Sequence, residues 1–308
     1  MISASVPASK LEYTQHLDPA GDKPTDRGMS WIHRTDPHHR PSAPRRNAPS
    51  LPRSWWIDRI PPAPSQSVAS RQSAAYPRRI MEPHEKIRWL CDRLLERYGM
   101  PAMSHSDPLE TLVLTILSQN TTDVNRDRAY SSLLKAFETF DAIRIAPIDA
   151  IARSIRAGGL HRQKSIAIRK ILQRIHDERG RLDLSFLGTC KLDAAMAWLL
   201  ASPGIGKKTA GIVMLFSFGK PYFPVDTHIR RVLTRLQLIE PKGDAHDQAN
   251  RLLPSDPDLM AALHLVMIQL GREICHPRAP NCAECPLRAE CPSADPARRS
   301  SAGSGGST

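Results

Sequence analysis

The chain has 308 residues, of which 41% are hydrophobic, and a net charge of +12. This length allows two domains with a sizeable core, and the basic balance favours a polyanionic partner. No run approaches the roughly 18 apolar residues of a membrane span and the N-terminus lacks an apolar secretion signal, so membrane and secreted proteins are excluded and a soluble intracellular protein is expected.

The first 80 residues differ in composition from the rest. They hold twelve of the 27 prolines and almost no helical or strand periodicity, which is typical of a disordered or polyproline-like segment. They also carry half of the net charge, because residues 81–308 contain 31 Lys and Arg against 25 Asp and Glu. Charge therefore gives a nucleic-acid partner only mild support. Met81 directly precedes the first helical pattern and is an alternative start of the chain.

From residue 83 onward the pattern is helical. An apolar stripe at helical spacing predicts the first helix, which ends before Gly99 and Pro101. The members of the stripe are Ile87, Leu90, Cys91, Leu94 and Leu95. Asp107 as N-cap, Pro108 and Glu110 then form a capping-box pattern that begins a second helix. Strand-like alternation is nearly absent, so the predicted fold class is all-α. Further helices are predicted at about 124–138, 148–157, 164–179, 191–201, 207–218, 227–237, 245–253 and 258–272.

A short glycine hairpin separates two of these helices, in the sequence Ser-Pro-Gly-Ile-Gly-Lys-Lys from position 202 to position 208. Two glycines around one apolar residue allow a tight turn whose N–H groups can cradle a phosphate at the start of the next helix. A plain helix–turn–helix connection explains the same residues, while the two lysines favour phosphate. The glycine spacing does not fit a Walker loop. Gly204, Gly206 and Lys207 are therefore candidate phosphate-binding residues.

Lys208 lies in the first turn of the helix that follows the hairpin. Most lysines on a helix surface are solvated charges, but here the positive end of the helix dipole and the neighbouring Lys207 both disfavour the ammonium form. A neutral amine is a nucleophile suited to Schiff-base chemistry. Lys208 is therefore a candidate catalytic nucleophile.

Asp226 precedes the helix predicted at 227–237, in the segment Val-Asp-Thr-His. It is expected to cap that helix by accepting a backbone hydrogen bond. A capped carboxylate is held rigidly beside whatever faces the helix end, so a catalytic role is compatible with the cap. His228 is expected to be structural rather than a base.

Four cysteines near the C-terminus, Cys275, Cys282, Cys285 and Cys291, are spaced C-x6-C-x2-C-x5-C. Without a secretion signal, such a group favours metal over disulfides. Structural zinc usually takes two close pairs and this run has one, so a [4Fe–4S] cluster with one cysteine per iron is the preferred interpretation and zinc the alternative. The cysteines at positions 91 and 190 are expected to act as small apolar core residues.

The hairpin with its lysine, the Val-Asp-Thr-His segment and the four cysteines, in this order, resemble the endonuclease III family of helix-hairpin-helix DNA glycosylases. The resemblance covers roughly residues 83–292. It implies a two-lobed, all-α fold with a cleft between a six-helix barrel lobe and an iron–sulfur cluster lobe. The implied parts are a disordered tail at 1–80, a cluster lobe formed by 81–101 with 220–292, a barrel lobe at 102–219 and a disordered tail at 293–308.

The resemblance also implies roles for individual residues. The family's catalytic lysine falls on Lys208, its catalytic aspartate on Asp226, and its cluster ligands on the four cysteines. Gln119 or Asn120 would fill the space left by a flipped nucleotide, and Leu160 would act as an apolar wedge. By the residues alone, these are a polar turn and an ordinary loop leucine.

The activity implied by the resemblance is base-excision repair. A DNA glycosylase with AP lyase activity would remove oxidised pyrimidines by lysine Schiff-base chemistry and cleave 3′ of the abasic site by β-elimination. Its partner would be double-stranded DNA containing damaged bases or abasic sites, bound by a monomer with no membrane association. The expected location is the bacterial cytoplasm at the nucleoid, or the nucleus or mitochondrion of a eukaryote.

Two alternatives stay open at this point. One is a mismatch-specific glycosylase of the same fold, and the other is a non-enzymatic helix-hairpin-helix DNA-binding protein with a structural metal. Ser202 and Leu200 depart from the commoner family pattern, since a leucine and an acid often stand there. These departures leave the chemistry intact and the preferred base open.

Overall fold

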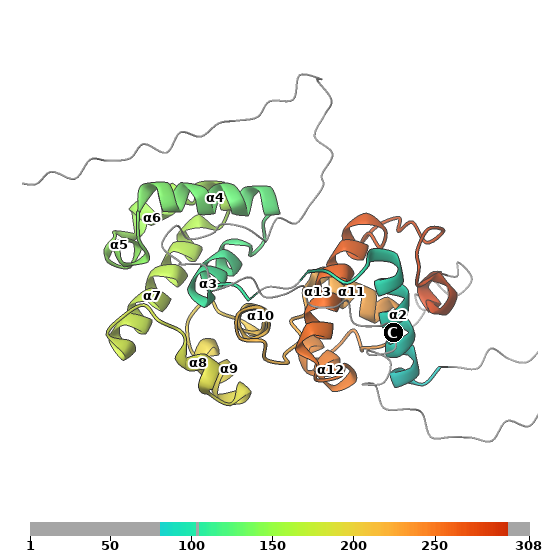
Figure 1. Ribbon diagram of the computed structural model, residues 1–308. Helices are drawn as coiled ribbons and strands as arrows, with labels where there is room; N and C mark the ends of the chain where they lie inside the picture. Colours follow the sequence, from blue (N-terminus) through green and yellow to red (C-terminus); the bar gives the residue numbers. More distant parts are fainter. Residues whose placement is uncertain (1–80, 103–104, 295–308) are drawn as a thin grey trace, which may run out of the picture. The chain divides into compact units, whose positions relative to one another are not determined.

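The computed structural model describes residues 81–102 and 105–294 (Figure 1). Every regular element within these ranges is a helix, so the predicted all-α class is confirmed. The two tails predicted to be disordered lie outside the described residues, apart from positions 293 and 294. None of the described helices is long and apolar enough to span a lipid bilayer.

The described helices vary widely in length. The α-helices are α2 (Pro83–Tyr98), α3 (Pro108–Leu117), α4 (Asp123–Ala136), α5 (Phe140–Ile145), α6 (Ile148–Ser154), α7 (His161–Arg179), α8 (Phe186–Thr189), α9 (Leu192–Leu200), α10 (Lys207–Phe218), α11 (Thr227–Arg235), α12 (Ala245–Leu252) and α13 (Pro257–Glu273). Three short 3-10 helices are η1 (Arg156–Gly158), η2 (Arg288–Glu290) and η3 (Pro292–Ala294). Each predicted helix corresponds to one of the α-helices, with ends that shift by a few residues.

The sequence pattern does not predict α5 and α8. They have 6 and 4 residues, too few for an apolar stripe to repeat. A cap marks the start of α5, because the Thr139 hydroxyl accepts a hydrogen bond from the Ala142 N–H at 3.1 Å. Such single-turn helices depend on caps and neighbours rather than on periodicity.

The predicted start of α3 is present in the structure. Asp107 Oδ1 accepts a hydrogen bond from the Glu110 N–H at 2.8 Å, and Pro108 occupies the first helical position. The Glu110 carboxylate accepts a hydrogen bond from the Tyr130 hydroxyl at 2.9 Å. The cap thus starts α3, and the acid of the capping-box pattern connects α3 to α4.

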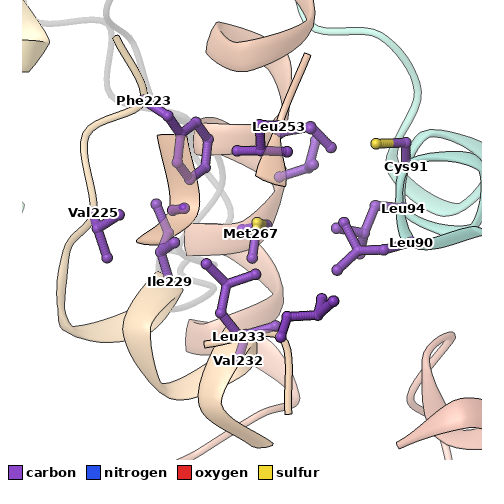
Figure 2. Close-up of a cluster of buried hydrophobic side chains, with 14 of the residues drawn as sticks. Leu90, Cys91, Leu94, Phe223, Val225, Ile229, Val232, Leu233, Leu253 and Met267 are labelled. Atoms are coloured by element: carbon purple, nitrogen blue, oxygen red, sulfur yellow. The ribbon is translucent and has the colours of Figure 1, made fainter. Parts of the chain in front are cut away.

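The first hydrophobic core joins α2 to α11, α12 and α13. Phe223 and Ile229 are completely buried in it. Figure 2 shows Leu90 and Leu94 of α2 facing Met267 of α13 within this core. Each such side chain contributes roughly 1.5–3 kcal/mol when buried. The helix at the start of the described chain is therefore held by helices from its C-terminal half.

The second hydrophobic core is built from α3, α4, α7, α9 and α10, together with the short helices α5, α6 and α8. Ile116 of α3 and Ile171 of α7 are completely buried in it. α10 contributes to both cores, with Val213 in the second and Leu215 in the first. Because Lys208 lies at the start of α10, the helix that carries the candidate nucleophile is fixed by both cores.

Candidate active site

The helix–hairpin–helix consists of α9, the turn at 201–206 and α10. Ile205 in this turn is 5% exposed and packs into the second core. Gly204 has a φ of +83°, and a Cβ there would lie 2.7 Å from the Cβ of Ala167 on α7, so glycine alone fits without displacing a neighbour. Gly206 is the N-cap of α10 and supplies no side-chain cap. The first turn of α10 therefore has the character of an anion-binding helix end.

A polar contact from α7 supports the hairpin. Arg174 donates hydrogen bonds to the Ser202 hydroxyl at 2.8 Å and to the Trp198 carbonyl at 2.7 Å. Its guanidinium lies 4.2 Å from the centre of the Trp198 ring, a distance at which the cation and the ring attract. Ser202 is 3% exposed, so its hydroxyl needs a partner. The departure of Ser202 from the commoner family pattern is thus matched locally by Arg174.

The two lysines at the start of α10 have different surroundings. Lys207 Nζ lies 2.8 Å from Asp244 Oδ2 and 2.7 Å from Asp247 Oδ1, and hydrogen bonds to these two carboxylates raise the pKa of Lys207. The sequence predicts that Lys207 binds a phosphate and disfavours the ammonium form of Lys208. Because its charge is paired with two carboxylates, both effects are weaker than predicted. Lys208 is partly exposed in the first turn of α10.

Asp226 is the N-cap of α11, as predicted. Its Oδ1 accepts a hydrogen bond from the Ile229 N–H at 2.8 Å, and the residue is partly exposed. His228 packs against α13, where a Cβ on Gly271 would lie 2.7 Å from the Cβ of His228. Burial lowers the pKa of His228, which is the usual effect of packing an imidazole away from water. These contacts agree with a structural role for His228.

A buried histidine lies close to both candidate catalytic residues. His264 on α13 is 2% exposed, and its Nδ1 lies 2.9 Å from the Pro224 carbonyl oxygen. Burial lowers the pKa of His264 to about 4; the charge of Asp226 opposes this shift and the charge of Lys208 adds to it. The charges of Lys208 and Asp226 therefore both affect the pKa of His264, so both residues lie within electrostatic range of this imidazole. The sequence pattern misses His264, because a lone histidine among apolar residues of a helix is normally assigned to the core.

Two of the residues predicted to insert into DNA have the same unusual backbone conformation. Asn120 has a φ of +49° and Leu160 a φ of +45°, conformations that residues other than glycine rarely adopt. Asn120 is exposed and Leu160 is 45% exposed. Gln119 differs, because its Nε2 donates a hydrogen bond to the Gly204 carbonyl at 3.0 Å. That amide connects the turn after α3 to the hairpin.

The four cysteines of the C-terminal motif follow α13. Cys275, Cys285 and Cys291 pack against the first core. Burial, and to a smaller extent the charges of the other three cysteines, raise the pKa of Cys285 to about 11, so the four sulfurs lie within electrostatic range of one another. Arg235 Nη1 donates to Cys275 Sγ at 3.1 Å. Such a set of sulfur donors fits a thiolate-bound cluster, although among the described residues no three Cys, His, Asp or Glu side chains surround one metal-ion position.

Comparison with known sequences agrees with this geometry. Residues 113–255 match the family described as HhH-GPD superfamily base excision DNA repair protein. Endonuclease III of Thermotoga maritima is 31% identical over 188 residues, which cover 60% of this chain and 83% of that protein. Endonuclease III of Sulfolobus acidocaldarius is 37% identical over 185 residues, which cover 59% of this chain and 80% of that protein.

Solved structures extend the similarity to the fold. A non-covalent endonuclease III–DNA complex matches with a TM-score of 0.60 at 25% identity, over 71% of this chain and 99% of that chain. A trapped covalent endonuclease III–DNA intermediate matches with a TM-score of 0.59 at 26% identity, over 70% of this chain and 97% of that chain. The expected helix-hairpin-helix glycosylase fold is therefore confirmed.

The fold, the hairpin and the matched residues define a DNA glycosylase of the HhH-GPD superfamily. Within that superfamily the chain belongs to the endonuclease III family, since it matches these relatives over most of their length. The resemblance noted in the sequence is thus confirmed, and so is the prediction that the protein is an enzyme. The alternative of a non-enzymatic DNA-binding protein is not supported.

Proposed function

We propose that the protein removes oxidised pyrimidines from double-stranded DNA and then cleaves the strand 3′ of the abasic site. The observation that supports this proposal is that α10, whose first turn carries Lys208, and α11, whose N-cap is Asp226, both pack against α13. Excision by this route needs a nucleophile and a carboxylate at the same sugar. The endonuclease III relatives support the substrate class.

DNA binding is proposed at the hairpin and at the two exposed left-handed residues. Gly206 leaves the start of α10 open to one backbone phosphate, and Gly204 allows the tight turn that precedes it. A damaged base leaves the stack at a lower cost than a normal one, and Asn120 and Leu160 would occupy the space that it vacates. Asn120 suits this role better than Gln119, whose amide is bound to the hairpin.

The excision step is proposed to use Lys208 as the nucleophile. Its neutral amine attacks C1′ of the flipped nucleotide, the bond between C1′ and the base breaks, and the electron pair of that bond leaves with the base, which is then protonated. Asp226 stabilises the positive charge that develops on the sugar and carries protons. Because Asp226 is fixed by its hydrogen bond to the Ile229 N–H, its carboxylate does not have to reorganise during the step.

Strand cleavage is proposed to follow from the same covalent bond. Opening of the sugar ring leaves a Schiff base between Lys208 and C1′. Loss of a proton from C2′ then expels the phosphate from C3′ as the leaving group, and water releases the sugar fragment from the lysine. A primary amine is needed for this step, because only a primary amine forms an imine with a sugar aldehyde, and the neighbouring amine of Lys207 is paired with Asp244 and Asp247.

Cys275, Cys282, Cys285 and Cys291 are proposed to hold a [4Fe–4S] cluster, one cysteine for each iron. The cluster would hold the segment between α13 and η3 in a fixed conformation. Every iron would be bound by the protein, and no iron would be free to bind substrate. The packing of Cys275, Cys285 and Cys291 against the first core supports this assignment, as does the effect of the other three cysteines on the pKa of Cys285, and the endonuclease III relatives support it as well.

Strand cleavage on single-lesion duplexes tests the proposed function. Wild type is expected to cleave duplexes that contain an oxidised pyrimidine or an abasic site, whereas Lys208→Gln is expected to cleave neither. Lys170→Gln is the matched control, since Lys170 is an exposed lysine on α7 and its loss should change nothing. Base release without strand cleavage by wild type would instead identify a glycosylase without lyase activity. Binding without base release would contradict excision altogether.

A further inference from the structure

Lys164, in the first turn of α7, is a lysine buried inside the protein. It is 2% exposed, although burying an ammonium charge is costly and lysines normally stay in water. Its Nζ donates hydrogen bonds to the carbonyls of Leu117 and Gly158, both at 2.7 Å. Burial lowers the pKa of Lys164 to about 8, with no contribution from a carboxylate in the described part of the chain. Two backbone carbonyls therefore hold this lysine.

These two carbonyls belong to the segments that lead to the exposed left-handed residues. Leu117 is the last residue of α3, after which the chain turns through Asn120. Gly158 is the last residue of η1, and Leu160 follows shortly after it. One side chain thus ties together the bases of two loops that are far apart in the sequence.

Both loops need such support. A non-glycine residue at positive φ is strained and persists only where its surroundings fix it. Asn120 and Leu160 are both in this conformation and both project from the surface, so their own side chains gain little from packing. Gly158 is buried against Ala129, where a Cβ would come within 3.1 Å of the alanine Cβ, and this fixes the second loop from the opposite side.

The charge of the lysine suits this place better than an apolar side chain of similar size. The Leu117 carbonyl lies at the C-terminus of α3, where the helix dipole is negative and a cation is stabilised. A buried carbonyl without a partner is destabilising, and here two carbonyls share one donor group. Replacing Lys164 by an apolar residue would therefore release both loops at once.

We infer that Lys164 is a positioning residue that holds Asn120 and Leu160 as one rigid pair, set for insertion into the space left by a flipped nucleotide. The inference rests on the proposed function, because it assigns these two residues to insertion. Lys164 acts through the loops and touches no reacting atom. A role in core packing alone would instead affect every activity of the protein equally.

The test compares two substrates that differ only in whether a base has to be extruded. Lys164→Met is expected to slow single-turnover excision of an oxidised pyrimidine by roughly tenfold to 100-fold. Cleavage of a preformed abasic site should stay within about threefold of wild type, since no base has to leave the stack there. Lys170→Met, an exposed change on the same helix, is expected to match wild type on both substrates. Equal losses on both substrates, or no loss on either, would overturn the inference.

A binding measurement separates failure of this inference from failure of the proposed function. The fluorescence of 2-aminopurine placed opposite the lesion reports insertion even if no bond is cleaved. Wild type should change this signal and Lys164→Met should not. A signal change with Lys164→Met as large as that with wild type overturns the positioning role. If the methionine variant is unfolded, Lys164→Gln, which keeps a donor, takes its place and is expected to retain part of the signal. A Lys164→Gln signal as large as that of wild type, despite its shorter side chain, also overturns the role.

Discussion

The Asp226 carboxylate accepts a hydrogen bond from the N–H of Ile229 at 2.8 Å. Its charge also raises the pKa of buried His264, which the charge of Lys208 lowers. One residue thus caps α11 and also carries a charge that, like that of Lys208, affects the pKa of His264. Asparagine caps a helix about as well as aspartate does, but it carries no charge. The two roles of Asp226 can therefore be separated by a single substitution.

Asp226→Asn is expected to leave the stability of the protein nearly unchanged and to impair catalysis. The cap survives, so the free energy of unfolding in urea should fall by less than about 1 kcal/mol. The rate of base excision should fall by roughly 100-fold to 1,000-fold, because the developing charge on the sugar loses its counter-charge. A variant that is stable and fully active would show that Asp226 is only a cap.

Gly204 and Gly206 provide a matched pair of substitutions in the hairpin. Gly204→Ala places a Cβ at positive φ and within 2.7 Å of Ala167, so we expect a loss of about 1–3 kcal/mol in the free energy of unfolding. Gly206 has a φ of −99°, and a Cβ there meets no atom within 4 Å. Gly206→Ala should therefore be tolerated. Thermal unfolding of the two variants checks the difference, and equal melting temperatures would contradict the hairpin geometry.

His264 predicts a pH dependence of stability. Its pKa is about 4 in the folded protein and about 6.5 when unfolded. Between these two pH values His264 is protonated in the unfolded chain and neutral in the folded protein. The stability that His264 contributes above pH 6.5 is lost as the pH falls towards 4, by at most about 1.4 kcal/mol per pH unit. His264→Gln keeps a donor for the Pro224 carbonyl and cannot titrate.

Urea unfolding of wild type and His264→Gln between pH 7 and pH 4.5 measures this contribution. The variant is expected to show the shallower decline. His228 and His246 have lowered pKa values as well, but they are present in both proteins and cancel in the comparison. Parallel curves for the two proteins would contradict the burial of a neutral His264.

The cysteine assignment predicts which thiols are needed to retain iron. Cys282→Ser is expected to lose the iron of the purified protein, about four atoms per chain, together with the visible absorbance of the cluster. Cys190 packs against the second core, away from the motif, so Cys190→Ser should keep both. Iron analysis and absorbance spectroscopy check this. Zinc in place of iron in the wild-type protein would support the alternative metal.

The helices and caps could largely be predicted from the sequence. The apolar stripe of α2 and the Asp107 cap of α3 each rest on residues that are neighbours in the chain. The single-turn α8 could not be predicted, since 4 residues carry no period. Local pattern thus predicts the elements that local forces form.

The candidate site was predictable only where a motif marks it. Lys208 and Asp226 stand in recognisable segments, but the partners of Lys207 come from α12, which no spacing rule connects to the hairpin. Lys164 looks like one more charge on a basic helix until the carbonyls of Leu117 and Gly158 are seen around it. Such contacts depend on how distant segments pack, and this information is not local in the chain.

Borohydride trapping on a duplex with a thymine glycol or an abasic site, followed by peptide mapping of the adduct, tests the central claim most directly. Reduction should convert the Schiff base into a stable bond, and the modified peptide should carry the sugar on Lys208 and not on Lys207, whose amine is paired with Asp244 and Asp247. Lys208→Gln should give no adduct. The absence of an adduct with wild type, or an undiminished adduct with Lys208→Gln, would contradict the account.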